Sequence, residues 1–214
     1  MTAIPADNNL AARQLVRSRR KAALATLDKD GAPYVSLVTY GVDHDLAPLL
    51  IVSAMSAHTR NMERDPRVSF LFDGSEGFAN PQEGPRFSLS GKAIKGEDSR
   101  LRTRFLALQP AAKMYAGFGD FSLWRVEPER GQLIGGFGRA NWINAPFGLS
   151  PDCIAAFEAG EDQALVRLAE AGRADIVRID PDGYATAIDD RVEWQAFVTP
   201  AGTPDDAISL ILTP

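Results

Sequence analysis

The first 145 residues alternate hydrophobic and polar positions in short runs, a pattern typical of β-strands. Asp30 and Gly31, a dipeptide typical of tight hairpin turns, separate the first two runs. The third run is apolar almost throughout, which predicts a strand buried on both faces. The expected strands cover residues 23–27, 34–40, 47–54, 67–73, 86–97 and 121–143. Strands at such short spacing favour an antiparallel barrel over a doubly wound parallel sheet.

Two longer segments of this part have apolar residues at helical spacing. One covers residues 8–20 after a capping residue at Asp7, and the other covers residues 98–118 from Asp98 onward. The second should break at Pro110, because proline removes a backbone donor inside a helix. The helices of this part are therefore expected mainly at the crossovers between strands.

The composition changes between Pro146 and Pro151, where the strand-rich part ends. The residues that follow predict an α-β-β-β-α unit. Its elements are a helix at 151–171, strands at 174–180, 184–189 and 191–198, and a last helix from Thr203. We expect two domains: a barrel of residues 1–147 and a small α/β domain of residues 148–214.

Composition and charge narrow the classes of partner. The chain has 214 residues, 45% of them hydrophobic, and a net charge of −5, which argues against a general polyanion-binding surface. Its single cysteine, Cys153, rules out an intramolecular disulfide and is expected to be a structural thiol. The start has no secretory-signal pattern, and no apolar run approaches the roughly 18 residues that span a bilayer. We expect a cytoplasmic protein without nucleic-acid or membrane partners.

A polar cluster separates the third and fourth strand-like runs. Thr59, Arg60 and Asn61 offer a hydroxyl, a guanidinium and an amide at the expected start of a short helix that ends at Asp65-Pro66. A helix start carries free backbone N–H groups and a partial positive charge. Because arginine also pairs with phosphate in a charge-assisted, two-pronged way, the cluster suits a terminal phosphate.

A second interpretation of the cluster is structural. Ser56 would cap the helix, and Arg60 would pair with Glu63 or Asp65 on the surface. The residues alone leave both interpretations open. A Rossmann-type phosphate loop is not expected, because the glycines of "GGFGRAN" end a strand run with no helix behind them.

The order of these elements resembles the FMN-binding split-barrel family, the relatives of pyridoxamine 5′-phosphate oxidase. The segments "VSAMSAHTRNMERDPRVS" and "GFGRA" carry the resemblance. Within the family, the chain is most similar to the HugZ-type branch, in which a split barrel is followed by a small α/β domain. The resemblance implies an α+β fold with an antiparallel split β-barrel, bound FMN, and a homodimer with each flavin at the subunit interface.

The resemblance also implies which residues bind the flavin. The residues that match the phosphate-binding segment are His58, Thr59, Arg60 and Asn61. The residues on strands that pass the flavin are Val35, Ser36, Val38, Val52 and Ser53. The residues of the segment that closes over the site are Gly138, Arg139 and Trp142.

Two departures limit the function that the resemblance implies. The chain lacks the C-terminal Arg-x-His motif of pyridoxamine phosphate oxidases and ends "ISLILTP", so vitamin B6 oxidation is not expected. No histidine follows His58, and Ala156 and Glu161 stand where the HugZ-type small domain often carries histidines. Haem breakdown through a histidine of that region is therefore not expected. His44 has no role in this scheme.

The sequence leaves three hypotheses. The first is an FMN-dependent oxidoreductase with an unknown substrate, in which the flavin supplies the redox chemistry. The alternative is a non-catalytic flavin- or haem-binding protein of the HugZ type. In the third hypothesis the cluster only caps a helix, and the protein binds neither cofactor. No acid–base pair of side chains and no metal ligand set is predicted.

Overall fold

The computed structural model describes residues 5–136, 138–189 and 191–213. The chain divides into two compact units, the first ending at Phe147 and the second beginning at Gly148. In the described ranges, no helix combines the length and the apolar character that crossing a bilayer requires.

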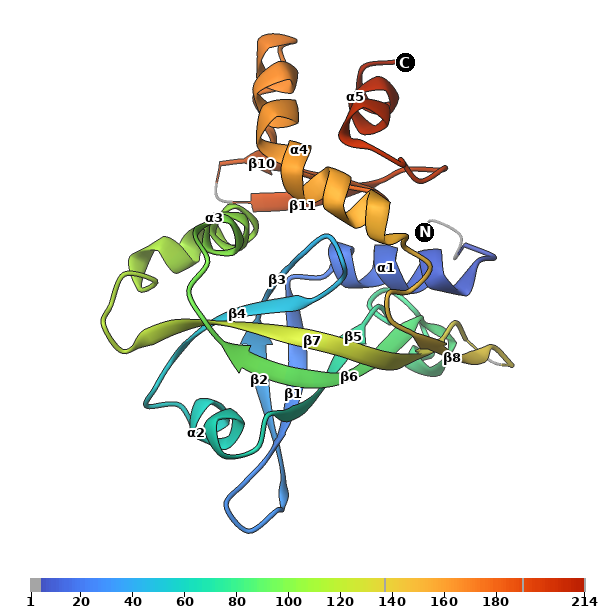
Figure 1. Ribbon diagram of the computed structural model, residues 1–214. Helices are drawn as coiled ribbons and strands as arrows, with labels where there is room; N and C mark the ends of the chain where they lie inside the picture. Colours follow the sequence, from blue (N-terminus) through green and yellow to red (C-terminus); the bar gives the residue numbers. More distant parts are fainter. Residues whose placement is uncertain (1–4, 137, 190, 214) are drawn as a thin grey trace. The chain divides into compact units, whose positions relative to one another are not determined.

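The first unit is built on a curled antiparallel sheet (Figure 1). Its strands are β1 (Lys21–Leu27), β2 (Pro33–Thr39), β3 (Gly41–Val42), β4 (Pro48–Ser53), β5 (Arg67–Asp73), β6 (Arg86–Lys95), β7 (Phe121–Ile134) and β8 (Ala140–Asn144). They pair in the order β2-β1-β5-β6-β7-β4-β3, and β8 pairs with β7. The predicted fold class, an antiparallel split barrel followed by a small α/β unit, is confirmed. The sequence pattern missed β3, which is too short to show a period.

Helices of the first unit begin at the predicted capping residues. They are α1 (Asn8–Ser18), α2 (Ala57–Arg64) and α3 (Ser99–Leu108), with short 3₁₀ turns η1 (Pro81–Glu83) and η2 (Pro110–Met114). Asp7 accepts a hydrogen bond from the Asn9 N–H, and Asp98 accepts one from the Leu101 N–H. Helix α3 ends just before Pro110, because proline has no backbone N–H to continue the α-helical hydrogen bonds. The chain continues there as the 3₁₀ turn η2.

Strand β4 is buried on both faces, as its apolar run predicted. On one face, Leu49 and Ile51 pack with Leu101 and Phe105 of α3. On the other face, alternate residues of the same strand point into the barrel. There, the aromatic residues of β5 and β6 stack in the interior, with ring centroids 5.7 Å apart for Phe70–Phe72 and 6.4 Å for Phe72–Phe87.

Buried charges join two helices to the turn between β3 and β4. Asp43 lies in this turn, is almost fully buried, and accepts hydrogen bonds of 2.8 and 2.9 Å from Arg100 of α3. Arg17 of α1 donates to the Asp43 carbonyl at 3.2 Å, and Arg104 of α3 donates to the Val42 carbonyl at 2.7 Å. The same turn of the sheet therefore anchors both helices.

Gly131 of β7 is required by close packing against the barrel interior. A Cβ at this position would lie 2.2 Å from the Phe87 ring. We expect Gly131→Ala to lower the free energy of unfolding by about 1–3 kcal/mol, because the buried ring has little room to move. Urea unfolding measures this, with Gly96→Ala as the matched control, since no atom lies within 4 Å of a Cβ there. Equal unfolding midpoints for the two variants would contradict the prediction.

The second unit has the predicted α-β-β-β-α order. Its elements are α4 (Pro151–Glu170), β9 (Ile176–Asp180), β10 (Gly183–Ile188), β11 (Arg191–Ala196) and α5 (Pro204–Leu212). The strands pair antiparallel in the order β11-β10-β9. Phe157, Leu168, Ile179 and Phe197 form its core. Thr203 and Asp206 cap α5 reciprocally, which explains the abrupt start of that helix.

Candidate functional site

Helix α2 begins without a side-chain cap. Ser56 occupies the N-cap position with an extended backbone, but among the described residues its side chain makes no capping hydrogen bond. The N-cap position that the structural interpretation gave to Ser56 is confirmed, but the side-chain bond that usually accompanies it is not formed among the described residues. Four N–H groups at a helix start lack partners within the helix. At α2 the Ser56 N–H already donates to the Ser53 carbonyl at 3.1 Å, so the donors that remain for another group are those of the first turn, at residues 57–59.

Arg60 lies on the exposed side of this helix start. Its Nη1 donates to the Met55 carbonyl at 2.7 Å, which folds the side chain back over the preceding turn. The two acids expected to compete for it pair elsewhere: Glu63 with a lysine of β6 and Asp65 with the arginine that opens β5. The expected surface pairing of Arg60 is therefore not formed, and its charge remains at the helix start.

Thr59 and Asn61 point away from Arg60, into the protein. Asn61 donates to Thr26 Oγ1 of β1 at 3.0 Å and accepts from Arg64 at 3.4 Å, so its amide anchors the helix to the sheet. Thr59 is only 1% exposed, and its Oγ1 has no hydrogen-bond partner among the described residues. Successive helix residues point about 100° apart, which explains why three consecutive polar residues do not share one face. Of the predicted trio, the structure leaves only Arg60 open to solvent.

His58 joins α2 to strand β2. Its Nδ1 lies 3.2 Å from Ser36 Oγ, and its Nε2 is enclosed without a hydrogen-bond partner in the described part of the chain. Burial lowers the pKa of His58 below its ordinary value, because the charged ring would lose solvation. Val38 is buried on the same face of β2 as Ser36, whereas Val35 is 63% exposed on the opposite face. The sequence-predicted residues of β2 therefore lie on two faces.

The end of β4 is tied to the loop before β7. Ser53 Oγ donates to Asp120 Oδ2 at 2.5 Å and accepts from the Met55 N–H at 3.1 Å. The Ala54 N–H donates to the Asp120 carbonyl at 2.8 Å. Val52 is buried in the strand. Asp120 was not predicted, because nothing in its local sequence marks a partner 67 residues away.

The predicted closing segment lies on different elements from α2. Gly138 has a φ of 76° in the turn before β8, a conformation that glycine adopts freely. Arg139 holds the start of the chain: its guanidinium donates to Asn8 Oδ1 at 2.7 and 2.9 Å and to the Pro5 carbonyl at 2.6 Å. Trp142 is exposed on β8, with the Arg130 guanidinium 5.0 Å from its ring centroid. Helix α2 packs on β1 and β2, whereas β8 packs along β7 and α1.

The middle of the outer face of the sheet is apolar across β2, β1 and β5, and the charges on this face, Lys21, Arg67 and Asp73, stand at the ends of their strands. Directly paired residues share a face, so the strand register aligns Leu37 with Ala23 and Leu71, and aligns Val35 with Ala25 and a serine of β5. Leu37 is 72% exposed. Strand β2 is also an edge of the described sheet, since it pairs only with β1. This surface, named here the outer face, offers an unpaired edge and apolar side chains together.

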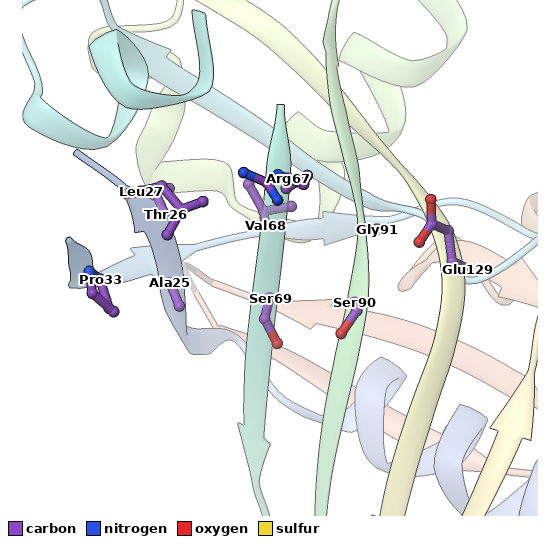
Figure 2. Close-up of a pocket in the computed structure, with 10 residues that line it drawn as sticks. All are labelled: Ala25, Thr26, Leu27, Pro33, Arg67, Val68, Ser69, Ser90, Gly91 and Glu129. Carbon is purple, nitrogen blue, oxygen red and sulfur yellow. The ribbon is translucent and has the colours of Figure 1, made fainter. Parts of the chain in front are cut away.

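A shallow groove of about 320 Å³ runs over the outer face (Figure 2). Ser69 of β5 and Ser90 of β6 are direct strand partners and lie side by side in it. Arg67 and Glu129 provide the charges at its rim. The groove is lined by small and apolar residues elsewhere, including Ala25. It suits contact with another surface better than enclosure of a small molecule, because it is shallow and mostly apolar.

These features define the class: an antiparallel split barrel with an open, positively charged helix start and an apolar outer face. The chain belongs to the family of pyridoxamine 5′-phosphate oxidase, whose family model matches residues 10–135. The HugZ-type branch within it is confirmed by the relatives that follow.

Two curated relatives carry haem in their names. The chain is 31% identical over 116 residues to the chloroplastic heme oxygenase HOZ of Arabidopsis thaliana. That alignment covers 52% of this chain and 34% of HOZ. It is 30% identical over 138 residues to the heme oxygenase HutZ of Vibrio cholerae. That alignment covers 60% of this chain and 76% of HutZ. The match therefore spans only about a third of HOZ but most of HutZ.

Two solved structures match nearly the whole chain. A protein of unknown function from Agrobacterium tumefaciens superposes with a TM-score of 0.78 at 26% identity, covering 98% of this chain and 96% of that one. A heme binding protein from Mycobacterium smegmatis gives a TM-score of 0.62 at 25% identity, with the same coverage. Both matches extend into the second unit.

Proposed function

We propose that the chain is a haem-binding protein of the HugZ type, the alternative that the sequence left open. The observation that carries this is the exposed guanidinium of Arg60 at an uncapped helix start, whose neighbouring acids pair elsewhere. A haem presents two carboxylates on a flat apolar ring, and carboxylates pair with guanidinium and free N–H groups as phosphates do. The names of three similar proteins support haem over flavin as the ligand.

The described residues fit the carboxylate end of a haem better than its iron. His44 is fully buried, and its Nε2 lies 3.5 Å from Arg104 Nη1. The Nδ1 of His58 faces Ser36, and its Nε2 is buried in the protein. Neither histidine presents an open nitrogen, so the assignment covers Arg60 and the start of α2 only. When bound, the iron supplies redox and oxygen chemistry, and the protein supplies orientation.

The second candidate is an FMN-dependent oxidoreductase, the first hypothesis from the sequence. One observation favours it: the start of α2 combines free N–H donors with one cation, which is the arrangement that a phosphate dianion requires. In this candidate the flavin phosphate takes the place proposed for a haem carboxylate. The two candidates therefore share Arg60 and differ in the ring that it holds.

Titration of the purified protein with hemin and, separately, with FMN tests the proposal. We expect saturable hemin binding, seen as a shifted and sharpened Soret band. We expect FMN, followed by the quenching of its fluorescence, to bind with lower affinity than hemin. Saturable FMN binding with only non-saturating uptake of hemin would favour the oxidoreductase candidate. Binding of neither would return the cluster to a structural role.

We also propose that the protein is a homodimer that associates through the outer face. A sheet edge with unpaired backbone groups beside exposed apolar side chains is normally covered in a native protein. A second copy is suited to it, because the middle of the outer face, where Leu37 stands beside Ala23 and Leu71, carries no charge that would repel its own copy.

Leu37→Asp tests this association. We expect sedimentation to show a dimer for the native protein at micromolar concentration and a dissociation constant at least about tenfold higher for the variant, since it places a charge in an apolar contact. The matched control is Ile188→Asp, which alters an exposed apolar residue of the second unit. A native monomer, or equal dissociation constants for the two variants, would refute the interface.

A further inference from the structure

Two turns of the first unit are joined beside the start of α2. The turn that follows β4 and the loop that precedes β7 lie together (Figure 1). Their backbones are linked by the 2.8 Å hydrogen bond from the Ala54 N–H to the Asp120 carbonyl, and their side chains by the bond between Ser53 and Asp120. This double link fixes the two turns to each other.

Each of the two turns exposes one large apolar side chain. Met55 follows Ala54 and is 74% exposed, and Phe118 stands two residues before Asp120 and is 58% exposed. Phe118 is held by aromatic packing, with its ring centroid 6.2 Å from that of Phe121 in an edge-on arrangement. Tyr115 supports Phe121 in turn at 4.9 Å. The two linked turns therefore each present an apolar group that water solvates poorly, one a fixed aromatic ring and the other a flexible thioether.

The cation of Arg60 is held at the turn that carries Met55. Its guanidinium donates to the carbonyl of Met55 itself, so charge and thioether belong to one turn. Apolar groups on linked turns, one of which also holds a cation, match a flat apolar ring that carries an anionic arm. An inorganic anion alone would leave the methionine and the phenylalanine without a role.

We propose that Met55 and Phe118 form a platform for the conjugated ring of the ligand whose anionic arm pairs with Arg60. This inference rests on the proposed function and adds the residues that contact the ring. Methionine sulfur contacts with aromatic rings are favourable, and offset or edge-on ring contacts add to them. Tetrapyrroles and flavins share this chemistry, so the platform serves the ring and takes no part in binding a metal.

The test compares Met55→Ala/Phe118→Ala with the native protein, using hemin, metal-free protoporphyrin IX and FMN as probes. We expect the double variant to bind its ring ligand about 5- to 50-fold more weakly, with hemin and protoporphyrin losing affinity alike because the platform contacts the ring. Val198→Ala is the control, because it shortens an exposed apolar residue of the second unit. Thermal melting checks that the double variant is folded.

The outcomes separate this inference from the proposed function. Loss for both porphyrins supports the platform with a tetrapyrrole as its ligand, and loss for FMN supports it with a flavin. A native protein that binds a probe and a folded double variant that binds it equally well would overturn the platform alone. A selective loss of hemin, with protoporphyrin binding unchanged, would also overturn it, since that would make Met55 an iron contact. A native protein that binds none of the three would overturn the proposed function and the platform with it.

Discussion

Arg60→Ala is expected to weaken binding of the proposed ligand, haem or FMN, by about 2–4 kcal/mol, or roughly 30- to 1000-fold. The variant keeps the backbone donors of α2 but removes the cation, and charge-assisted pairs are about twice as strong as neutral hydrogen bonds. The side chain is exposed, so the fold should survive its loss. Hemin titration followed at the Soret band and FMN titration followed by fluorescence measure the change.

Two controls separate charge from geometry. Lys29→Ala removes a positive charge from the exposed hairpin turn and should leave affinity unchanged. Arg60→Lys keeps the charge but loses the two-pronged geometry, and it should fall between the native protein and Arg60→Ala. Riboflavin lacks the phosphate, so it should bind weakly to the native protein and lose little more in Arg60→Ala. Unchanged affinity for both hemin and FMN in Arg60→Ala would refute the assignment.

Asp43→Asn is expected to lower the free energy of unfolding by about 3–5 kcal/mol. The substitution removes the charge that Arg100 contacts through two hydrogen bonds and leaves cations in a buried turn without their carboxylate. Urea unfolding at pH 7 measures the loss. Asp30→Asn is the matched control, since that carboxylate is exposed in the β1–β2 turn. A loss no larger than that of the control would contradict the role of Asp43.

The effect of Asp43 should depend on pH in a defined direction. Burial alone would raise the pKa of Asp43, but the hydrogen bonds from Arg100 and the charges of Arg104 and His44 hold it at about 2. The pKa in the unfolded chain is higher, near 3.9. The stabilisation is therefore complete above about pH 4 and is lost as the pH falls toward 2. The difference in stability between the native protein and Asp43→Asn should shrink over that window.

The sequence predicted the first unit well where local signals act alone. The Asp30-Gly31 turn, the cap at Asp98 and the break at Pro110 each depend on residues adjacent in the chain. The apolar run of β4 predicted burial on both faces, because a strand covered on one side only would alternate. Such signals need no knowledge of the tertiary fold.

The candidate site was only partly predictable, because its geometry depends on orientation and on distant partners. The sequence placed Thr59, Arg60 and Asn61 together, but the helix rotates two of them into the protein. Arg139 fits a ligand-binding role by resemblance, whereas in the structure it holds Asn8. The bond between Ser53 and Asp120 joins residues that no local pattern relates.

Strand β2 serves two surfaces with alternate residues of one short segment. Its even-numbered positions, Ser36 and Val38, face His58 and the interior, and its odd-numbered positions, Val35 and Leu37, face outward. Alanine substitution one position at a time should therefore yield alternating effects: Ser36→Ala removes the contact with His58 of α2, whereas odd positions alter subunit exchange under the proposed interface. A step of a single residue along the strand would thus separate assembly from the support of α2, which lets each be changed while the other stays intact.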